Sequence, residues 1–168
     1  MSLTMYQASI PGFLRMLGNL SAILDKAAAH AEAKKIDPAI FVNARLAPDM
    51  FPLSRQVQIA TDMVKGCAAR LAGIEVPRYE DNETSFADLQ ARIAKTVAFI
   101  QSVSAPQIDG SEDCQITLKF GSRELGFLGQ AYLLDFVLPN FHFHLTTAYA
   151  ILRHNGVDIG KMDYVGNY

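Results

Sequence analysis

The amino-acid sequence predicts a mainly α-helical fold, a bundle of four long helices with a small β-hairpin between the third and the fourth. Two observations lead to this prediction. Apolar residues recur at spacings of three and four along four separate segments, as in helices that bury one face. Between the last two segments polar and apolar residues alternate, as in a β-strand. The 168 residues are enough to bury one core, so we expect a single domain over residues 1–168.

The first two long helices are predicted in the N-terminal half of the chain. Pro11 is expected in the first turn of the first helix, where a missing N–H costs little. Asp49 is the expected N-cap of the second helix, and Gly73 its stop. Asp37-Pro38 predicts a short helical turn between the two. The apolar stripes are Ile10, Phe13, Leu14, Leu17, Leu20, Leu24, Ala28 and Ala31, and then Leu53, Val57, Ala60, Val64, Cys67, Ala68 and Leu71.

The third and fourth helices carry clearer end signals. Ser85, three residues before Asp88, resembles a capping box for the third helix. Pro139 suits the first turn of the fourth helix and Gly156 suits the residue after its end. The stripes are Phe86, Leu89, Ile93, Val97, Ile100 and Val103, and then Phe141, Leu145, Ala148 and Leu152.

The region between these two helices predicts a β-hairpin. Residues 115–120 alternate strictly, residues 123–128 are the returning strand, and Gly121-Ser122 is the turn. Residues 132–138 are either a helical lead-in that is kinked at Pro139 or an irregular crossing. The tail, residues 157–168, is expected on the surface without regular structure.

Charge and composition exclude several classes of function. The formal net charge is -2, and no basic stripe indicates nucleic-acid binding or an anionic membrane surface. No apolar run is long enough for a membrane span, and no secretory signal is recognisable. Cys67 and Cys114 lack metal-type or redox-type spacing, so we expect free thiols in a reducing, cytoplasmic compartment.

The fourth helix contains the densest group of candidate functional residues. His142 and His144 are two residues apart, so they lie about 200° apart around a regular helix and cannot bind one metal together. His144 lies beside the apolar stripe and is expected to face the bundle, while Tyr149 shares a face with His142. An ordinary structural role for both histidines, one solvated and one hydrogen-bonded, remains open.

The second helix contributes Gln56, Gln58 and Asp62 as candidates. Gln58 and Asp62 are four residues apart and share a helix face. A buried Asp62 would need a partner, and a histidine of the fourth helix would serve, either in a site or in a structural polar pair. The acidic group Tyr79 to Glu83 is expected to be a solvated loop. No glycine-rich phosphate loop and no nucleophile elbow is present in the sequence.

Three motifs show a resemblance to a known family. They are P-D-M-F-P-L-x-x-Q-V-Q-x-A-x-D at residues 48–62, P-N-F-x-F-H at 139–144, and A-Y-A-I-L-R-H-N-G-V-x-I-G-K-x-D at 148–163. The chain resembles an uncharacterised, mainly bacterial family in the DinB/YfiT-like superfamily of proposed metalloenzymes. The resemblance covers essentially the whole chain and implies a DinB/YfiT-like four-helix bundle.

The resemblance also implies a divalent metal held by three histidines, one from the second helix and two from an H-x-x-x-H on the fourth. Some members of the superfamily use a low-molecular-weight thiol, and many are homodimers. Here residues 51–73 contain no histidine and the fourth helix has no H-x-x-x-H, so the metal ligand set is incomplete.

Three functional hypotheses follow. The first is a protein that binds a small molecule in the bundle interior with a degenerate metal site. The second is a non-catalytic homodimeric interaction module. The third is a metal-dependent, thiol-transferase-like enzyme with a non-standard site. For the first hypothesis the site is expected to be lined by Gln56, Gln58, Asp62, His142, His144 and Tyr149.

Overall fold

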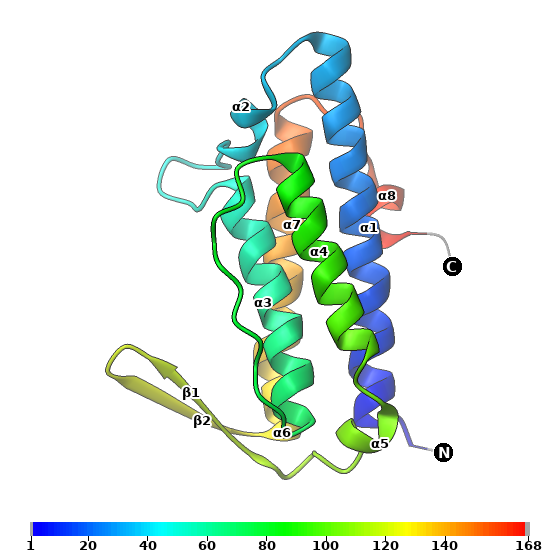
Figure 1. Ribbon diagram of the computed structural model, residues 1–168, viewed down its shortest axis with the longest axis vertical. Helices are drawn as coiled ribbons and strands as arrows, with labels where there is room; N and C mark the ends of the chain where they lie inside the picture. Colours follow the sequence, from blue (N-terminus) through cyan, green and yellow to red (C-terminus); the bar gives the residue numbers. More distant parts are fainter. Residues whose placement is uncertain (1, 167–168) are drawn as a thin grey trace.

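The computed structural model describes residues 2–166 and is mainly helical, with one small antiparallel hairpin. Four long helices lie side by side along the long axis of the molecule (Figure 1). They are α1 (Met5–Lys34), α3 (Leu53–Leu71), α4 (Phe86–Gln101) and α7 (Leu138–His154). The predicted count of four covers only these, because the described residues also form short helices: α2 (Pro38–Val42), α5 (Ala105–Ile108), α6 (Gly129–Ala131), a π-helix η1 (Tyr132–Val137) and α8 (Lys161–Val165).

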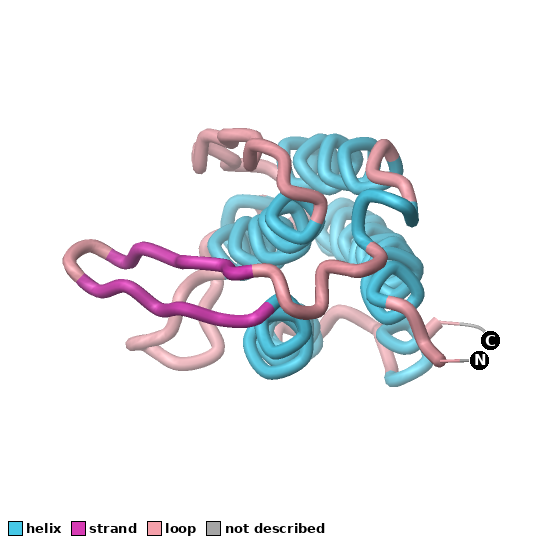
Figure 2. Tube along the Cα trace, turned by 90° about the horizontal axis from the view of Figure 1, so that it is seen from below, coloured by secondary structure: helices cyan, strands magenta, loops and turns pink. Residues whose placement is uncertain are grey.

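One apolar core fills the space between the long helices. Seen end-on in Figure 2, the four helices surround a common centre, and α3 contacts both α4 and α7. Phe13 of α1 and Phe141 of α7 meet edge to face, with ring centroids 5.4 Å apart. Most residues of the predicted stripes are fully buried, so the helical periodicity identified the core correctly.

Several predicted helix ends are confirmed and two are wrong. Ser85 caps α4 in a capping box with Asp88, and Gly73 follows α3 with a φ of 67°. The start of α1 is earlier than predicted, because Thr4 forms a capping box with Gln7, and Pro11 therefore lies inside the helix. Asp49 does not cap α3, which begins after Pro52 without a side-chain cap.

The hairpin lies where it was predicted. Strands β1 (Gln115–Phe120) and β2 (Arg123–Leu128) pair antiparallel, with Leu118 opposite Leu125. It projects sideways from one end of the helices (Figures 1 and 2). Ile116 and Leu118 are buried, which anchors its base.

Of the two alternatives predicted for the segment before α7, the helical lead-in is confirmed and the irregular crossing is wrong. Residues 129–154 are helical throughout, and η1 is a π-helical stretch that leads directly into α7. Pro139 has no N–H to donate, which removes one α-helical hydrogen bond at this junction and favours a wider turn. The turn places Tyr132 and Phe136 next to each other, with ring centroids 6.0 Å apart and nearly parallel rings.

The prediction of an irregular surface tail is wrong for residues 161–165, which form α8, and for the buried residues Val157 and Ile159. Helix α8 lies against α1, where Lys26 pairs with Asp163 and Asn19 donates a hydrogen bond to the Tyr164 carbonyl. Val157 and Ile159 are buried before it. Residues 167 and 168 lie outside the described residues. No described helix is both long and apolar enough to cross a membrane.

Candidate functional site

The six residues proposed from the sequence do not form one site. They separate into a pair inside the bundle, a network between α3 and α4, and a group that faces α8. The members of these groups are Gln56 and His144, then Gln58 and Asp62, and then His142 and Tyr149.

The pair inside the bundle joins α3 to α7. His144 Nδ1 lies 2.7 Å from Gln56 Oε1, and the amide nitrogen of Gln56 donates to the carbonyl of Phe51. Since that bond turns the amide oxygen toward His144, the imidazole donates its Nδ1–H. Burial, with a smaller effect of Arg55, lowers the pKa of His144, so the ring is neutral at pH 7. Both side chains are nearly inaccessible to solvent.

The predicted Asp62–histidine pair is wrong. Asp62 lies at the edge of α3, where it forms ion pairs with Lys65 at 2.7 Å and with Arg92 of α4 at 2.9 Å. Gln58 is buried beside it and donates to Glu83 at 2.8 Å. The helix period correctly placed Gln58 and Asp62 on one face, but that face meets α4 and not α7.

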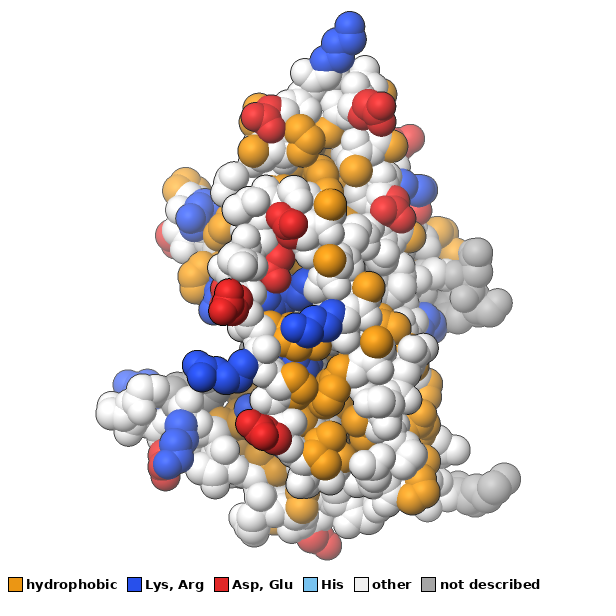
Figure 3. All heavy atoms as spheres, viewed as in Figure 1, with side chains coloured by type: hydrophobic (Ala, Val, Ile, Leu, Met, Phe, Trp, Pro, Cys, Tyr) orange, Lys and Arg blue, Asp and Glu red, His pale blue; other side chains and the backbone are white. Residues whose placement is uncertain are grey.

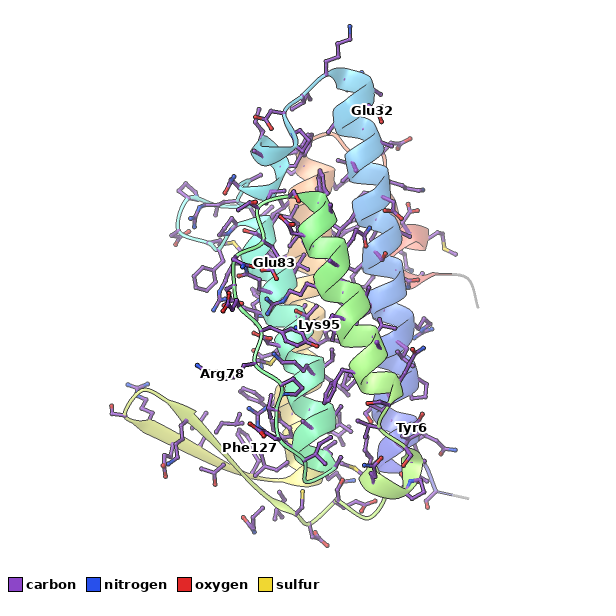
Figure 4. The ribbon with its side chains drawn as sticks, in the orientation of Figure 1. Tyr6, Glu32, Arg78, Glu83, Lys95 and Phe127 are labelled. Atoms are coloured by element: carbon purple, nitrogen blue, oxygen red, sulfur yellow. The ribbon has the colours of Figure 1, made fainter. Side chains whose placement is uncertain are left out.

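Arg92 is the centre of this network. Its side chain is only 2% exposed, and it bonds Asp62, Asp81 and Glu83 as well as the Thr61 hydroxyl. Two of these acids belong to residues 75–84, which we call the strap because they run from α3 back to α4 along the outside of the helices (Figure 4). The expectation of a solvated acidic loop is therefore wrong for Glu83, whose side chain is 8% exposed.

The last group lies on the opposite side of α7. His142 Nδ1 is 3.3 Å from the hydroxyl of Tyr164 in α8, and Thr146 donates to the same hydroxyl. The rings of Tyr149 and Tyr164 pack edge to face. Burial and the nearby Arg15 lower the pKa of His142. These contacts hold α8 in place and account for the residues structurally.

The histidines present do not fit the superfamily's three-histidine metal. His144 is bonded to Gln56 inside the bundle, and His142 faces α8. Helix α3 supplies no histidine at all. Within residues 2–166, no three His, Cys, Asp or Glu side chains are grouped so that they could hold an ion.

A cleft lies elsewhere, between α3, the strap, β1 and η1. We call it the basic cleft; its volume is about 420 Å³. It is lined by Asp62, Met63, Lys65, Arg70, Val76, Pro77, Arg78, Tyr79, Leu118, Lys119, Tyr132 and Phe136. Figure 3 shows basic side chains across the middle of this face, above the hairpin; of those labelled in Figure 4, Lys95 lies on α4 outside the cleft lining, and Arg78 leaves the strap on the hairpin side. Four basic residues and one acidic residue line it, although the whole chain has a net charge of -2.

The walls of the basic cleft combine fixed cations with aromatic rings. Lys65 Nζ lies 3.8 Å from the ring centre of Tyr79, and its side chain is almost fully buried. On the far wall the hydroxyl of Tyr132 accepts a hydrogen bond from Arg70 Nη1 at 2.9 Å. Burial, reinforced by the neighbouring Cys67, raises the pKa of Tyr132 to about 12, so the phenol stays protonated at pH 7.

A second hollow, of about 520 Å³, lies on the other side of Tyr79. Its lining includes Glu80, Glu83 and Asp88 together with Arg92 and Lys95. Arg92 is already saturated by its own partners, and the charges of this hollow are mixed. It is less suited to a charged ligand than the basic cleft.

Sequence reasoning did not identify the basic cleft because its parts come from four separate segments. One local signal was available. Gly66 and Arg70 lie four residues apart on α3, and an isolated glycine in a helix interior usually has a packing reason.

Residues 2–166 form a mainly helical fold with one hairpin, and comparison with a solved structure shows that this is the fold of a DinB-like helical protein. The structure is similar to that of a DinB family member protein from Shewanella denitrificans, with 41% identity and a TM-score of 0.87, covering 97% of this chain and 92% of that one. The chain belongs to the DUF1993 family, a domain of unknown function whose profile matches residues 5–165. None of the curated proteins compared with the chain matches it.

Proposed function

We propose that the protein binds a small organic anion with an apolar body, and that it does so in the basic cleft. One observation carries the proposal: four cationic side chains line one cleft together with the aromatic residues Tyr79, Tyr132 and Phe136. A volume of about 420 Å³ lies within the roughly 300–1,000 Å³ of ligand sites. Apolar walls with a few placed polar groups are typical of such sites.

This proposal places the ligand in the basic cleft and not in the bundle interior, where the sequence predicted it. Gln56 and His144 bond each other there at 2.7 Å and leave no donor directed at a ligand. The metal-dependent thiol-transferase hypothesis gains no support from the histidines, which face different sides of α7. We therefore propose binding without the three-histidine metal.

A blocking variant tests the proposal. The dissociation constant of 1-naphthoate would be measured by calorimetry for the native protein, for Val76→Trp and for Ile74→Trp. Val76 lines the cleft, so an indole there should remove binding. Ile74 precedes α4 in the same connection, is 39% exposed and does not line the cleft, so its variant should bind like the native protein. The proposal fails if the native protein does not bind, or if Val76→Trp binds equally well.

A further inference from the structure

We propose, resting on the proposed function, that Arg70 binds the carboxylate of the ligand and that Gly66 is the residue that positions Arg70 for this. The two residues are one turn apart on α3, whose C-terminal end borders the basic cleft.

Arg70 is a half-buried cation of the cleft that has no acidic partner among the described residues, whereas Arg78, the other lining cation without one, is exposed. Lys65 pairs with Asp62, Lys119 with Glu124, and Arg92 with three acids. Within the described part of the chain, no Asp or Glu lies at ion-pair distance from Arg70. Because the guanidinium is half-buried and lacks a counter-ion, an anion that entered the cleft would find a charge that is not already neutralised.

Among the described residues, the one hydrogen bond of the Arg70 side chain uses Nη1, and the other N–H groups of its guanidinium are available to a ligand. Nη1 donates to the Tyr132 hydroxyl, which sets the position of the guanidinium against η1. The remaining N–H groups have no protein acceptor among the described residues. A planar carboxylate accepts two parallel N–H bonds from such a fork, which gives both strength and orientation. The partly exposed rings of Phe136 and Tyr79 line the cleft and offer a surface for an aromatic body attached to that carboxylate, and the buried Tyr132 stacks on Phe136 with a 17° interplanar angle.

Gly66 makes this position of Arg70 sterically possible. Helical side chains lean toward the N-terminus, so the side chain of residue 70 lies over residue 66. A Cβ at Gly66 would overlap Arg70 Nη1 and lie 3.4 Å from Cζ. An alanine at 66 would therefore push the guanidinium away from Tyr132. Glycine in a helix interior disfavours the helix, and here it provides the space that the arginine occupies.

The test compares a charged probe with a neutral one of the same shape, 1-naphthoate with 1-naphthalenemethanol. Arg70→Gln should weaken naphthoate binding about tenfold or more, with little change for the alcohol. Gly66→Ala should weaken naphthoate binding in the same selective way while its melting temperature does not fall, since alanine favours the helix. Gly18→Ala in α1, where a Cβ meets nothing within 4 Å, is the matched control and should bind like the native protein.

The double variant separates positioning from a general effect. If Gly66 acts through Arg70, then Gly66→Ala/Arg70→Gln should bind naphthoate as Arg70→Gln does, with no further loss. Losses that add, or a naphthoate affinity unaffected by either single variant, would overturn this inference. Such results leave the proposed function standing, because that depends on the native protein binding the probe and on Val76→Trp blocking it.

Discussion

At the scale of single residues, burial determines what each candidate side chain can do. His144 and His142 are two positions apart, yet one is enclosed between α3 and α7 while the other meets α8. Tyr132 is almost fully buried, and its pKa of about 12 keeps it a hydrogen-bonding phenol. The same residue types on a surface would titrate and hydrate freely, so their roles follow from their surroundings and not from their identity.

The buried His144 predicts a specific dependence of stability on pH. Its pKa in the folded protein is lowered by burial, so the unfolded chain takes up more protons as the pH falls below about 6.5. Its contribution to stability is complete above that pH and is lost as the pH falls through the folded-state pKa. Urea unfolding at about pH 7.5 and about pH 5 should therefore show a smaller loss of unfolding free energy in His144→Asn than in the native protein. An equal or larger loss in the variant would contradict this.

At the scale of elements, the strap and the π-helix shape the basic cleft. The strap has no regular secondary structure, and its position depends on the contacts of Asp81, Glu83 and Tyr79 with Arg92. The π-helix supplies Tyr132 and Phe136 on the opposite side. Both elements are needed to form a cleft, because α3 alone presents a convex surface.

Removing the side chain of Arg92, which binds the acidic residues of the strap, should destabilise the fold. Arg92→Ala leaves Glu83 buried without a counter-ion, and breaking such a buried ion pair costs about 3 kcal/mol of unfolding free energy. Lys26→Ala removes an ion pair whose lysine is 53% exposed, and should cost less than about 1 kcal/mol. Urea denaturation of both variants measures the contrast. Equal losses would show that the strap is held by something other than Arg92.

At the scale of the whole molecule, charge is distributed unevenly. The chain is slightly acidic overall, while four cations and one acidic residue line its basic cleft. Such a local field attracts small anions despite the net charge.

We also propose, from the family resemblance alone, that the protein is a homodimer. Sedimentation equilibrium should give twice the 18.4 kDa mass of the chain. A mass of one chain at micromolar concentrations would contradict the proposal.

The sequence by itself determined the four long helices, the hairpin and most of the core. Periodicity located the four long helices, alternation located the hairpin, and Ser85, Gly73 and Gly156 marked helix ends, because these signals act between residues near each other in the chain. Only the tertiary structure decided which faces meet. It paired Asp62 with Arg92 and Gln56 with His144, and it brought Arg70, the strap and the hairpin around one cleft. The physical reason is that a helix period shows which residues share a face, whereas the partner of that face depends on how all the helices pack together.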